Sequence, residues 1–234
     1  MSAAVPRHVA FIMDGNRRFS KRVMLKPWKG HEWGEQKLRE VITWCHELGV
    51  QEVTVYALSV QNFERPQEEF DFLMQLFRES AKRIKAEREM YDKMNVRLVF
   101  IGRLHMLPDD VREAICEAME VTKDNTGMRV NIAVAYGGRE EVVDAVKQVA
   151  EQVAAGSLAL DEINEKVFAR SLYTDSEPDV VIRTGGEQRT SNFLIWQSHY
   201  AEWIFVEKLW PEFSHEDLVT CLAEFADRKR RFGK

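Results

Sequence analysis

Four short stretches of this chain gather arginines together with glycines, asparagine and hydroxyl side chains. They are Asp14-Gly15-Asn16-Arg17-Arg18, the turn SVQNFER at 59–65, the stretch YGGRE at 136–140, and RTGGEQRTS at 183–191. Guanidinium forks, backbone N–H groups and helix amino termini all bind phosphate oxygens. The four stretches therefore predict a site for one or two phosphate or diphosphate groups.

Each stretch taken alone also has a purely local explanation. Asp, Asn, Ser and Gly are favoured at helix caps and turns because of their own hydrogen bonds and backbone freedom. At least one arginine accompanies these residues in all four stretches, which local turn chemistry does not require. The set therefore favours a ligand site over four unrelated turns.

Two carboxylates, Asp14 and Glu202, are candidate ligands for a divalent metal ion. Magnesium takes oxygen ligands from one or two carboxylates and from substrate phosphates, so it suits this combination. Asp14 among arginines could instead be a salt-bridge partner, and His31 alone would more often be structural than catalytic. No cluster of His and Cys indicates zinc. The motifs GxxxxGK, GxGxxG and GxSxG are absent, so ATP hydrolysis, nicotinamide chemistry and serine hydrolysis are poorly supported.

The composition fits one domain over residues 1–234, with 45% hydrophobic and 30% charged residues. A formal net charge of −5 disfavours nucleic acid as a partner, because binding to a phosphate backbone needs a basic face. Cys45, Cys116 and Cys221 lack the spacing of a zinc site or a disulfide framework and are expected to be reduced, in or near the core. No secretory signal or apolar run of about 20 residues is present, which predicts a cytoplasmic location.

Six short runs rich in branched apolar residues have the pattern of buried strands: 9–13, 53–58, 96–101, 130–135, 180–182 and 203–206. Between them lie segments with helical spacing: 34–48, 67–94, 108–123, 140–154 and 215–230. The alternation predicts an α/β fold with a central, mostly parallel six-stranded sheet and helices on both faces. Ligands of open parallel sheets bind beyond the carboxyl ends of the strands, where the four stretches fall.

Long motifs of the chain closely resemble those of the cis-prenyltransferases, the family of undecaprenyl and dehydrodolichyl diphosphate synthases. The motifs are HVAFIMDGNRRF at 8–19, GH at 30–31, VTVYALSVQNFERPQEE at 53–69, NIAVAYGGREEVVDAV at 131–146, DVVIRTGGEQRTSNFLIWQSHYAEWIFVEKLWPEF at 179–213 and RRFG at 230–233. The resemblance runs in order over nearly the whole chain. DDxxD, the motif of the all-helical trans-prenyltransferases, is absent.

This resemblance implies a homodimer with a hydrophobic tunnel beside the sheet. The implied reaction is magnesium-dependent condensation of isopentenyl diphosphate onto an allylic diphosphate primer, farnesyl or geranylgeranyl diphosphate, giving a Z-polyprenyl diphosphate and releasing diphosphate. Contact with a membrane would be peripheral.

The resemblance also implies a role for individual residues. Asp14 matches the catalytic aspartate that holds magnesium, with Glu202 as the second carboxylate near the metal. Asn16, His31, Ser59 and Asn62 match the other catalytic positions. Residues matching substrate-binding positions are Gly15, Arg17, Arg18, Phe19 and Arg65 for the allylic substrate, Arg183, Arg189 and Ser191 for isopentenyl diphosphate, and Arg231 and Gly233 in an RxG motif that reaches across the dimer.

Three departures from the family pattern bear on the substrate site. Pro27 stands where an arginine is common, so Lys26 or Lys29 would have to replace one diphosphate contact. Leu58 stands where an aromatic residue is common and could narrow the tunnel entrance, and Gln61 stands where glutamate is usual. These departures leave open a short-chain or single-condensation synthase of the same family. A non-catalytic lipid-binding subunit is less well supported, because Asp14 and the arginines are kept.

Overall fold

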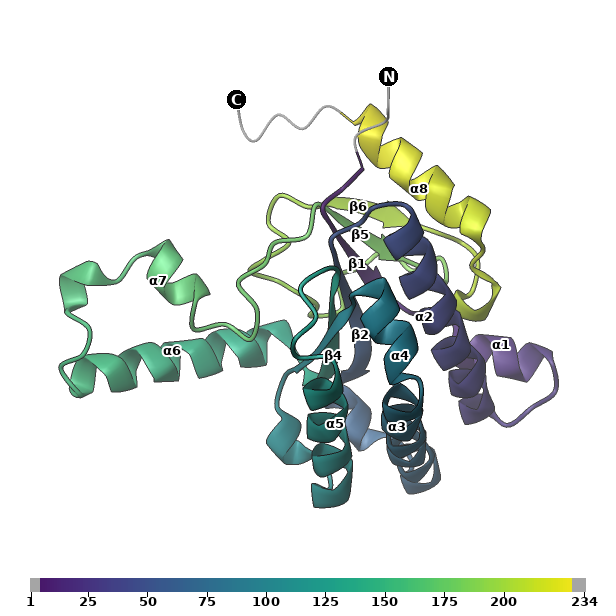
Figure 1. The fold of residues 1–234 in the computed structure, drawn as a ribbon, viewed down its shortest axis with the longest axis horizontal. Coiled ribbons are helices and arrows are strands. Elements are labelled where there is room, and N and C mark those ends of the chain that lie inside the picture. The colour runs from purple at the N-terminus through teal and green to yellow at the C-terminus, as the bar shows by residue number, and fades with distance from the viewer. Residues whose placement is uncertain (1–4, 229–234) are drawn as a thin grey trace.

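Six strands form the centre of the structure, a computed structural model that describes residues 5–228 (Figure 1). Every strand pair is parallel, and the order across the sheet is β3-β4-β2-β1-β5-β6. The predicted parallel six-stranded sheet is confirmed. Each end of each strand lies within one residue of its prediction: β1 His8–Ile12, β2 Glu52–Ser59, β3 Arg97–Ile101, β4 Arg129–Tyr136, β5 Val180–Arg183 and β6 Glu202–Phe205.

The central strands are continuous apolar runs because both of their faces are covered. All residues of β1 and β5 are buried, and so are all but one of β4. Ile12 of β1 is paired with Tyr56 of β2 on one side and with Arg183 of β5 on the other. The carboxyl ends of these three strands therefore lie side by side, and the loops that leave them meet.

Eight α-helices surround the sheet in the described part of the chain (Figure 1). They are α1 Asn16–Arg22, α2 Gly30–Glu47, α3 Gln67–Ala86, α4 Arg88–Met94, α5 Asp109–Val121, α6 Gly138–Ala154, α7 Glu165–Ala169 and α8 His215–Asp227. The helix expected over 67–94 is two helices, because the chain turns at Glu87, where φ is −99° and ψ is 21°. α2 begins four residues before its predicted start at Gly34, and the five-residue α7 was not predicted.

The main core lies on one face of the sheet, under α2, α3, α5 and α8. Phe11, Ile115, Trp210 and Phe213 are among its fully buried side chains. The other face packs against an irregular segment around Phe193 and Leu194 rather than against a helix. The prediction of helices over both faces is wrong in this respect, because the chain between β5 and β6 is a loop with left-handed backbone at several residues.

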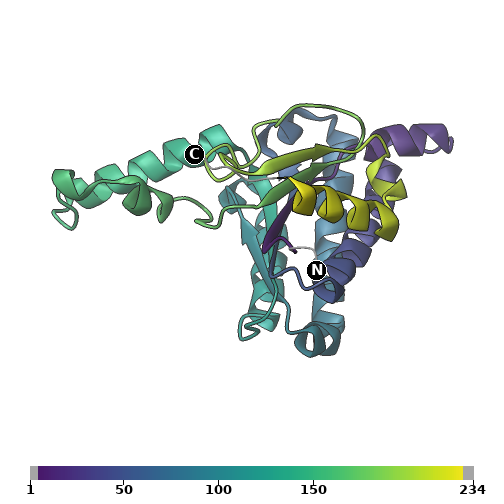
Figure 2. The ribbon, with the colours of Figure 1, turned by 90° about the horizontal axis from the view of Figure 1, so that it is seen from above.

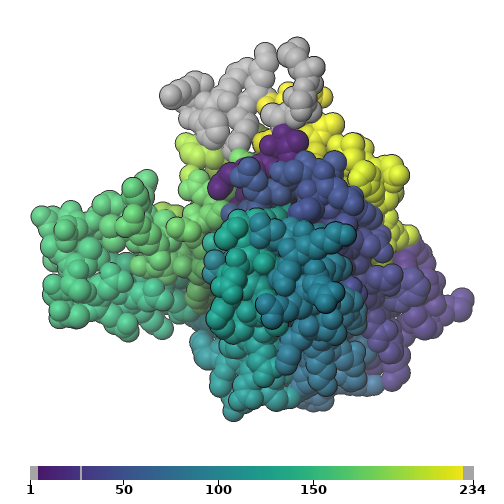
Figure 3. Space-filling view, in the orientation of Figure 1, coloured from purple at the N-terminus to yellow at the C-terminus, as the bar shows by residue number. Residues whose placement is uncertain are grey.

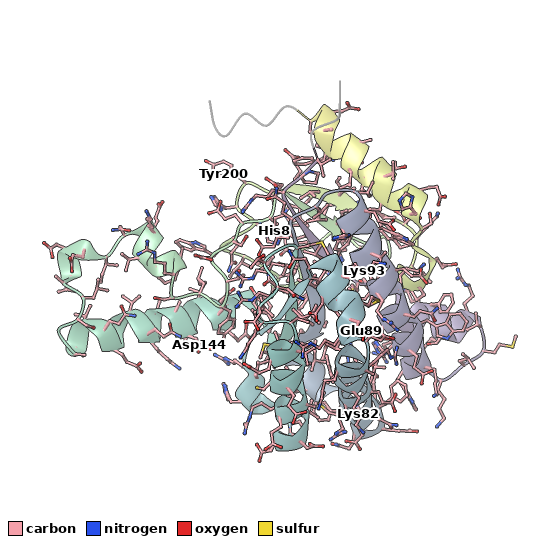
Figure 4. All side chains as sticks on the ribbon, in the orientation of Figure 1. His8, Lys82, Glu89, Lys93, Asp144 and Tyr200 are labelled. Carbon is pink, nitrogen blue, oxygen red and sulfur yellow. The ribbon has the colours of Figure 1, made fainter. Side chains whose placement is uncertain are left out.

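Two further features follow the sequence pattern. The charged end of the 67–94 segment is solvated, and Lys82, Glu89 and Lys93 point outward from α3 and α4 (Figure 4). α6 and α7 project from the sheet as an arm, which we define as residues 138–169 (Figures 1 and 2). The arm stands out as a separate lobe in the space-filling view (Figure 3).

Two predictions from composition are tested by the fold. Cys45 and Cys221 are buried free thiols as expected, whereas Cys116 is exposed on α5. Within residues 5–228, no helix combines the length and the apolar character that crossing a membrane would require.

Candidate active site

The loop after β1 is fixed from two sides. The carbonyl of Asp14 accepts hydrogen bonds from the Trp210 amide at 2.9 Å and from the Thr184 hydroxyl at 2.8 Å. Gly15 has φ +111°, and a Cβ there would lie 2.9 Å from Leu209. Only glycine allows this left-handed turn at such a close approach. The chain thus changes from a buried strand to the polar start of α1 within two residues.

The carboxylate of Asp14 is paired with two arginines. Its Oδ2 accepts a hydrogen bond from Nη2 of Arg183 at 2.9 Å, and its Oδ1 accepts one from Nη2 of Arg18 at 3.1 Å. The other end of the buried Arg183 guanidinium donates to the Arg189 carbonyl and, at 2.7 Å, to Oγ of Ser191. Arg183 therefore ties the first loop to the loop after β5. The salt-bridge interpretation of Asp14 is confirmed, while its role as a metal ligand stays a prediction.

The loop after β5 has a strained backbone beside the site. Ser191 and Asn192 have φ of 51° and 62°, a left-handed conformation that costs energy for residues other than glycine. Asn192 is held by α6, because its carbonyl accepts from Gly138 N at 2.7 Å and its side chain accepts from Arg139 N at 2.9 Å. The YGGRE stretch was expected to bind phosphate, but it supports this loop instead, and none of residues 136–139 lines the clefts described next.

Two clefts open at the carboxyl ends of the strands. The first, which we call the arginine cleft, is lined by Met13, Asp14, Gly15, Asn16, Arg17, Arg18, Lys21, His31 and Arg65. The second, which we call the serine cleft, lies between the loops that follow β1, β2 and β5. It is lined by Ile12, Met13, Asp14, Asn16, His31, Tyr56, Ala57, Ser59, Gln61, Asn62, Arg65, Arg189, Ser191 and Asn192. Both clefts carry cationic side chains, and the serine cleft also carries hydroxyls; binding of one or two phosphate or diphosphate groups there stays a prediction.

An apolar cavity adjoins both clefts between α2, α3 and the sheet. It encloses about 120 Å³, where a single water needs only roughly 10–15 Å³. Leu38, Leu73, Leu76, Phe77 and Ile132 are among the residues that line it. Three residues, Met13, Asn16 and His31, line the cavity and both clefts. The arginine cleft and the serine cleft thus meet the apolar cavity at one place.

Burial determines the state of the groups at this meeting point. The pKa of His31 lies below its ordinary value, mainly because the ring is buried. Oδ1 of Asn16 and Nε of Arg183 are buried without a hydrogen-bond partner within the described residues. Such atoms are uncommon in folded proteins, and a bound water or ion is one explanation for them.

Most of the predicted site residues are brought together, but Glu202 and Phe19 are not. Glu202 pairs with Val180, which also pairs with Val9, so it is level with the amino end of β1. About 10 Å of strand therefore separates it from the level of Ile12, at a rise of about 3.3 Å per residue. Its Oε2 accepts from Arg228 at 2.8 Å. A metal site that uses Asp14 and Glu202 of one chain does not form.

Phe19 and the carboxyl-terminal RxG motif are the remaining predicted positions. Phe19 lines neither cleft and packs on Trp33, with ring centroids 5.5 Å apart, so it fixes α1 against α2. Arg231 and Gly233 fall outside the described residues. Leu58 is buried in the core and does not line the apolar cavity, where its neighbour Ala57 is found instead. A shift of strand register at this point of β2 sets which side chain faces the cavity.

The sequence reasoning missed Met13 at the meeting point and two charged residues in or beside the arginine cleft. Lys21 lines the arginine cleft, and its position three residues after Arg18 on α1 was the available signal. Glu69 contacts His31 and Arg65, and its spacing of four residues from Arg65 was a similar signal. Both signals are weak because charged pairs at these spacings occur on any exposed helix.

Comparison with known proteins identifies the family to which this chain belongs. A family model described as putative undecaprenyl diphosphate synthase matches residues 12–233. This chain belongs to the undecaprenyl diphosphate synthase family. The resemblance to the cis-prenyltransferases is therefore confirmed, and with it the assignment of the chain as an enzyme of this class.

Members of the undecaprenyl diphosphate synthase family match along nearly all of the chain. A geranylgeranyl-diphosphate-specific tritrans,polycis-undecaprenyl-diphosphate synthase of Methanopyrus kandleri is 48% identical over 98% of this chain and 85% of its own length. A farnesyl-diphosphate-specific ditrans,polycis-undecaprenyl-diphosphate synthase of Micrococcus luteus is 41% identical over 99% and 93%. The crystal structure of lavandulyl diphosphate synthase from Lavandula x intermedia, in complex with dimethylallyl diphosphate, has a TM-score of 0.93 at 36% identity over 98% of this chain and 99% of its own.

The structure tests which lysine replaces the arginine that the family commonly has at the position of Pro27. Lys26 and Lys29 were the candidates to replace an arginine there, but Lys26 Nζ pairs with Glu68 at 2.8 Å and Lys29 Nζ with Glu32 at 2.8 Å. Neither lysine lines the arginine cleft. Lys21 does, so the additional cation of this cleft comes from α1 rather than from the segment around Pro27.

Proposed function

We propose that the chain is a magnesium-dependent Z-polyprenyl diphosphate synthase that condenses isopentenyl diphosphate onto geranylgeranyl or farnesyl diphosphate. The observation that carries this proposal is the meeting of two anion clefts and one apolar cavity at Met13, Asn16 and His31. Two diphosphates and one hydrocarbon chain are what the reaction must hold together. Geranylgeranyl diphosphate is the favoured primer, because the relative from Methanopyrus kandleri is named as specific for it.

The allylic substrate is assigned to the arginine cleft, with its chain in the apolar cavity. Arg17, Arg18 and Arg65 supply forked donors for its diphosphate, and Lys21 supplies a further charge. Ionisation of the allylic C–O bond leaves negative charge on the departing diphosphate, and fixed cations stabilise that charge as it develops. Each methylene that stays in the cavity contributes about 0.8 kcal/mol, which retains the growing chain.

Isopentenyl diphosphate is assigned to the serine cleft, where Arg189 and Ser191 face Ser59 and Asn62. Its double bond would then approach the allylic carbon near Asn16 and His31, which line both clefts. Proton loss after carbon–carbon bond formation needs an acceptor close by. The pKa of His31 is lowered, chiefly by burial, so a neutral ring is available there.

The residues present fit a magnesium ion bound together with substrate. Among residues 5–228 no group of three or more His, Cys, Asp or Glu side chains forms a ready cage. Magnesium commonly binds through one or two carboxylates plus substrate phosphates, and Asp14 lines both anion clefts. Asp14 would hold the ion, which when bound would neutralise charge on the leaving diphosphate.

A homodimer and peripheral membrane contact are part of the same proposal. Apolar side chains are exposed on the arm and on the edge strand, with Val143 50%, Val146 53% and Phe205 37% exposed. Exposed apolar groups of this kind suit a contact with a second copy of the chain. We further propose a cytoplasmic enzyme that releases its lipid product to a membrane surface.

A second candidate is a short-chain or single-condensation synthase with the same site. The observation that favours it is the close structural match to lavandulyl diphosphate synthase. The two candidates share the clefts and differ in the number of condensations. Product length therefore separates them.

The test is a chain-extension assay with the purified protein, labelled isopentenyl diphosphate and magnesium. Geranylgeranyl, farnesyl and dimethylallyl diphosphate are supplied in parallel reactions. Long polyprenyl products, abolished by a metal chelator and restored by added magnesium, are expected. A product with a single added unit would select the second candidate, and no extension of any primer would refute both.

A further inference from the structure

Glu69 is a buried carboxylate that lines neither cleft nor the apolar cavity. It lies in the first turn of α3, where acidic residues are favoured by the helix dipole. That preference does not require burial, and the neighbouring Glu68 has a side chain that is 64% exposed. The side chain of Glu69 is only 1% exposed. Its burial therefore needs another explanation.

One oxygen of Glu69 is contacted by groups from three other segments. Oε1 accepts a hydrogen bond from Nη1 of Arg65 at 2.8 Å, lies 3.4 Å from Nε2 of His31, and forms an ion pair with Nε of Arg17 at 3.8 Å. Nη1 of Arg65 also lies 3.3 Å from Nε2 of His31. All three partners line the arginine cleft. Glu69 is therefore placed directly behind that cleft, on the side away from its opening.

The charges at this point need a fixed anion. Two guanidinium groups always carry positive charge and repel one another in a small space, and a carboxylate between them offsets that repulsion. A buried carboxylate needs such partners in turn. The pKa of Glu69 is held below its ordinary value, first by the hydrogen bond to His31 and then by Arg65 and Arg17. The carboxylate is thus ionised and is matched to the groups around it.

We propose that Glu69 is a positioning residue for the allylic diphosphate, holding Arg17, His31 and Arg65 in the arrangement that receives it. The proposal rests on the proposed function of the arginine cleft. Arg17 and Arg65 have side chains 49% and 23% exposed, so without this anchor each could turn into solvent. Arg17 lines the arginine cleft alone, whereas His31 and Arg65 also line the serine cleft, so the loss of Glu69 is expected to affect the allylic substrate most.

Two other roles for Glu69 make different predictions. If Glu69 only secures the start of α3, its loss lowers the melting temperature and leaves substrate binding unchanged. If Glu69 merely offsets positive charge, its loss makes the cleft more cationic and the allylic substrate binds more tightly. A positioning role predicts weaker binding of the allylic substrate, with a smaller effect on isopentenyl diphosphate.

The experiment compares Glu69→Gln with Glu68→Gln, an exposed neighbour in the same helical turn, in the full-length enzyme. Steady-state kinetics give KM separately for geranylgeranyl diphosphate and for isopentenyl diphosphate, and thermal unfolding gives the melting temperature. We expect Glu69→Gln to raise the KM for the allylic primer at least tenfold and to raise that for isopentenyl diphosphate by a smaller factor, because Arg17 lines only the arginine cleft. Glu68→Gln should match the wild type. An unchanged or lower allylic KM in Glu69→Gln overturns the proposal.

Two additions keep the result decisive. Glu69→Asp keeps the charge and shortens the side chain, so it should raise the allylic KM by a smaller factor than Glu69→Gln does. If Glu69→Gln does not fold, an unchanged allylic KM in Glu69→Asp overturns the proposal. Calorimetric titration with inorganic diphosphate and magnesium reports on the cleft without any reaction. If the wild type extends no primer, the proposed function fails, and weaker diphosphate binding by Glu69→Gln still supports the positioning role, whereas equal binding refutes it.

Discussion

Asp14 Oδ2 accepts a hydrogen bond from Nη2 of Arg183 at 2.9 Å, and this contact joins the loops that leave β1 and β5. Arg183 is buried, so its charge needs a fixed partner, and Asp14 provides it. The same carboxylate lines both the arginine cleft and the serine cleft. Asp14 thus holds the loops after β1 and β5 together, in addition to the metal-binding role that we propose for it.

Replacing Asp14 with asparagine is expected to lower kcat by about 10²–10³-fold, the range found when one electrostatic contact of a transition state is lost. The fold should remain, because Asn can still accept from Arg183 and Ser191 keeps its bond to the same guanidinium. Chain-extension kinetics with circular dichroism as a check on folding would measure this.

Two comparisons complete the Asp14 experiment. Asp124→Asn removes an equally charged but exposed side chain far from the clefts, and it should leave kcat unchanged. The concentration of magnesium that gives half-maximal rate should rise in Asp14→Asn, since a carboxylate ligand is lost. An unaltered kcat in the folded Asp14→Asn protein would remove Asp14 from the proposed mechanism.

The backbone of Gly34 lies against the side chain of Asn16, and this contact gives a second prediction. A Cβ at Gly34 would lie 2.5 Å from Asn16 Oδ1, closer than packing permits. Gly34→Ala should therefore displace the amide that lines all three cavities. A reduction of roughly 10–100-fold in kcat/KM is expected, since displacement by about 1 Å can cost 10²-fold.

The stability of Gly34→Ala should change little, because alanine gains about 0.5–1 kcal/mol over glycine inside a helix and so offsets part of the clash. A double-mutant cycle with Asn16→Ala tests the cause. In the Asn16→Ala background the added Gly34→Ala change should have almost no further effect on kcat/KM. Independent, multiplying effects would show that Gly34 acts by another route.

The cation that replaces the missing arginine is the subject of the third prediction. Lys21 lines the arginine cleft, whereas Lys26 is paired with Glu68 outside it. Lys21→Ala should raise the KM for the allylic primer roughly three- to tenfold. This is a small effect for the loss of a charged contact, because the Lys21 side chain is exposed and solvent screens its charge. Lys26→Ala is the matched control and should change KM less than twofold. The reverse order of effects would assign the role to Lys26.

The strands were predictable because burial on both faces leaves a continuous apolar run, as in β1 and β5. The break of α3 at Glu87 was not, since helical spacing continues through it and only φ and ψ mark it. α7 was missed because five residues carry too little periodicity. Local patterns thus give the elements but not their interruptions.

The site shows the same limit at the level of single residues. Residues that leave β1, β2 and β5 could be grouped from sequence because parallel strands place their carboxyl ends together. Glu202 was placed near the metal only by the resemblance, although the predicted strand 203–206 begins directly after it and so puts it at the amino end of that strand. Glu68 and Glu69 are identical in type and adjacent, and only packing makes one exposed and the other buried.

Glu141 of α6 supplies a prediction about pH and stability. Its carboxylate is 1% exposed and accepts hydrogen bonds from the Tyr136 hydroxyl, from Tyr173 N at 2.9 Å and from Gln197 Nε2 at 3.0 Å. Burial raises its pKa above the ordinary 4.5, more than these bonds lower it. The folded protein therefore binds this proton more readily than the unfolded chain does.

The sign of the effect follows from that difference. The free energy of unfolding of the wild type, relative to that of Glu141→Gln, is highest below about pH 4.5, the pKa of Glu141 in the unfolded chain. This advantage is lost as the pH rises from 4.5 through the pKa of Glu141 in the folded protein. Each unit of pKa shift is worth about 1.4 kcal/mol. Urea unfolding between neutral pH and pH 4.5 measures the difference, with Glu151→Gln, an exposed residue of the same helix, as the control. The difference in free energy of unfolding between wild type and Glu141→Gln could instead stay constant over this pH range. Glu141 would then keep an ordinary pKa in the folded protein, and the hydrogen bonds that hold the arm would not depend on pH.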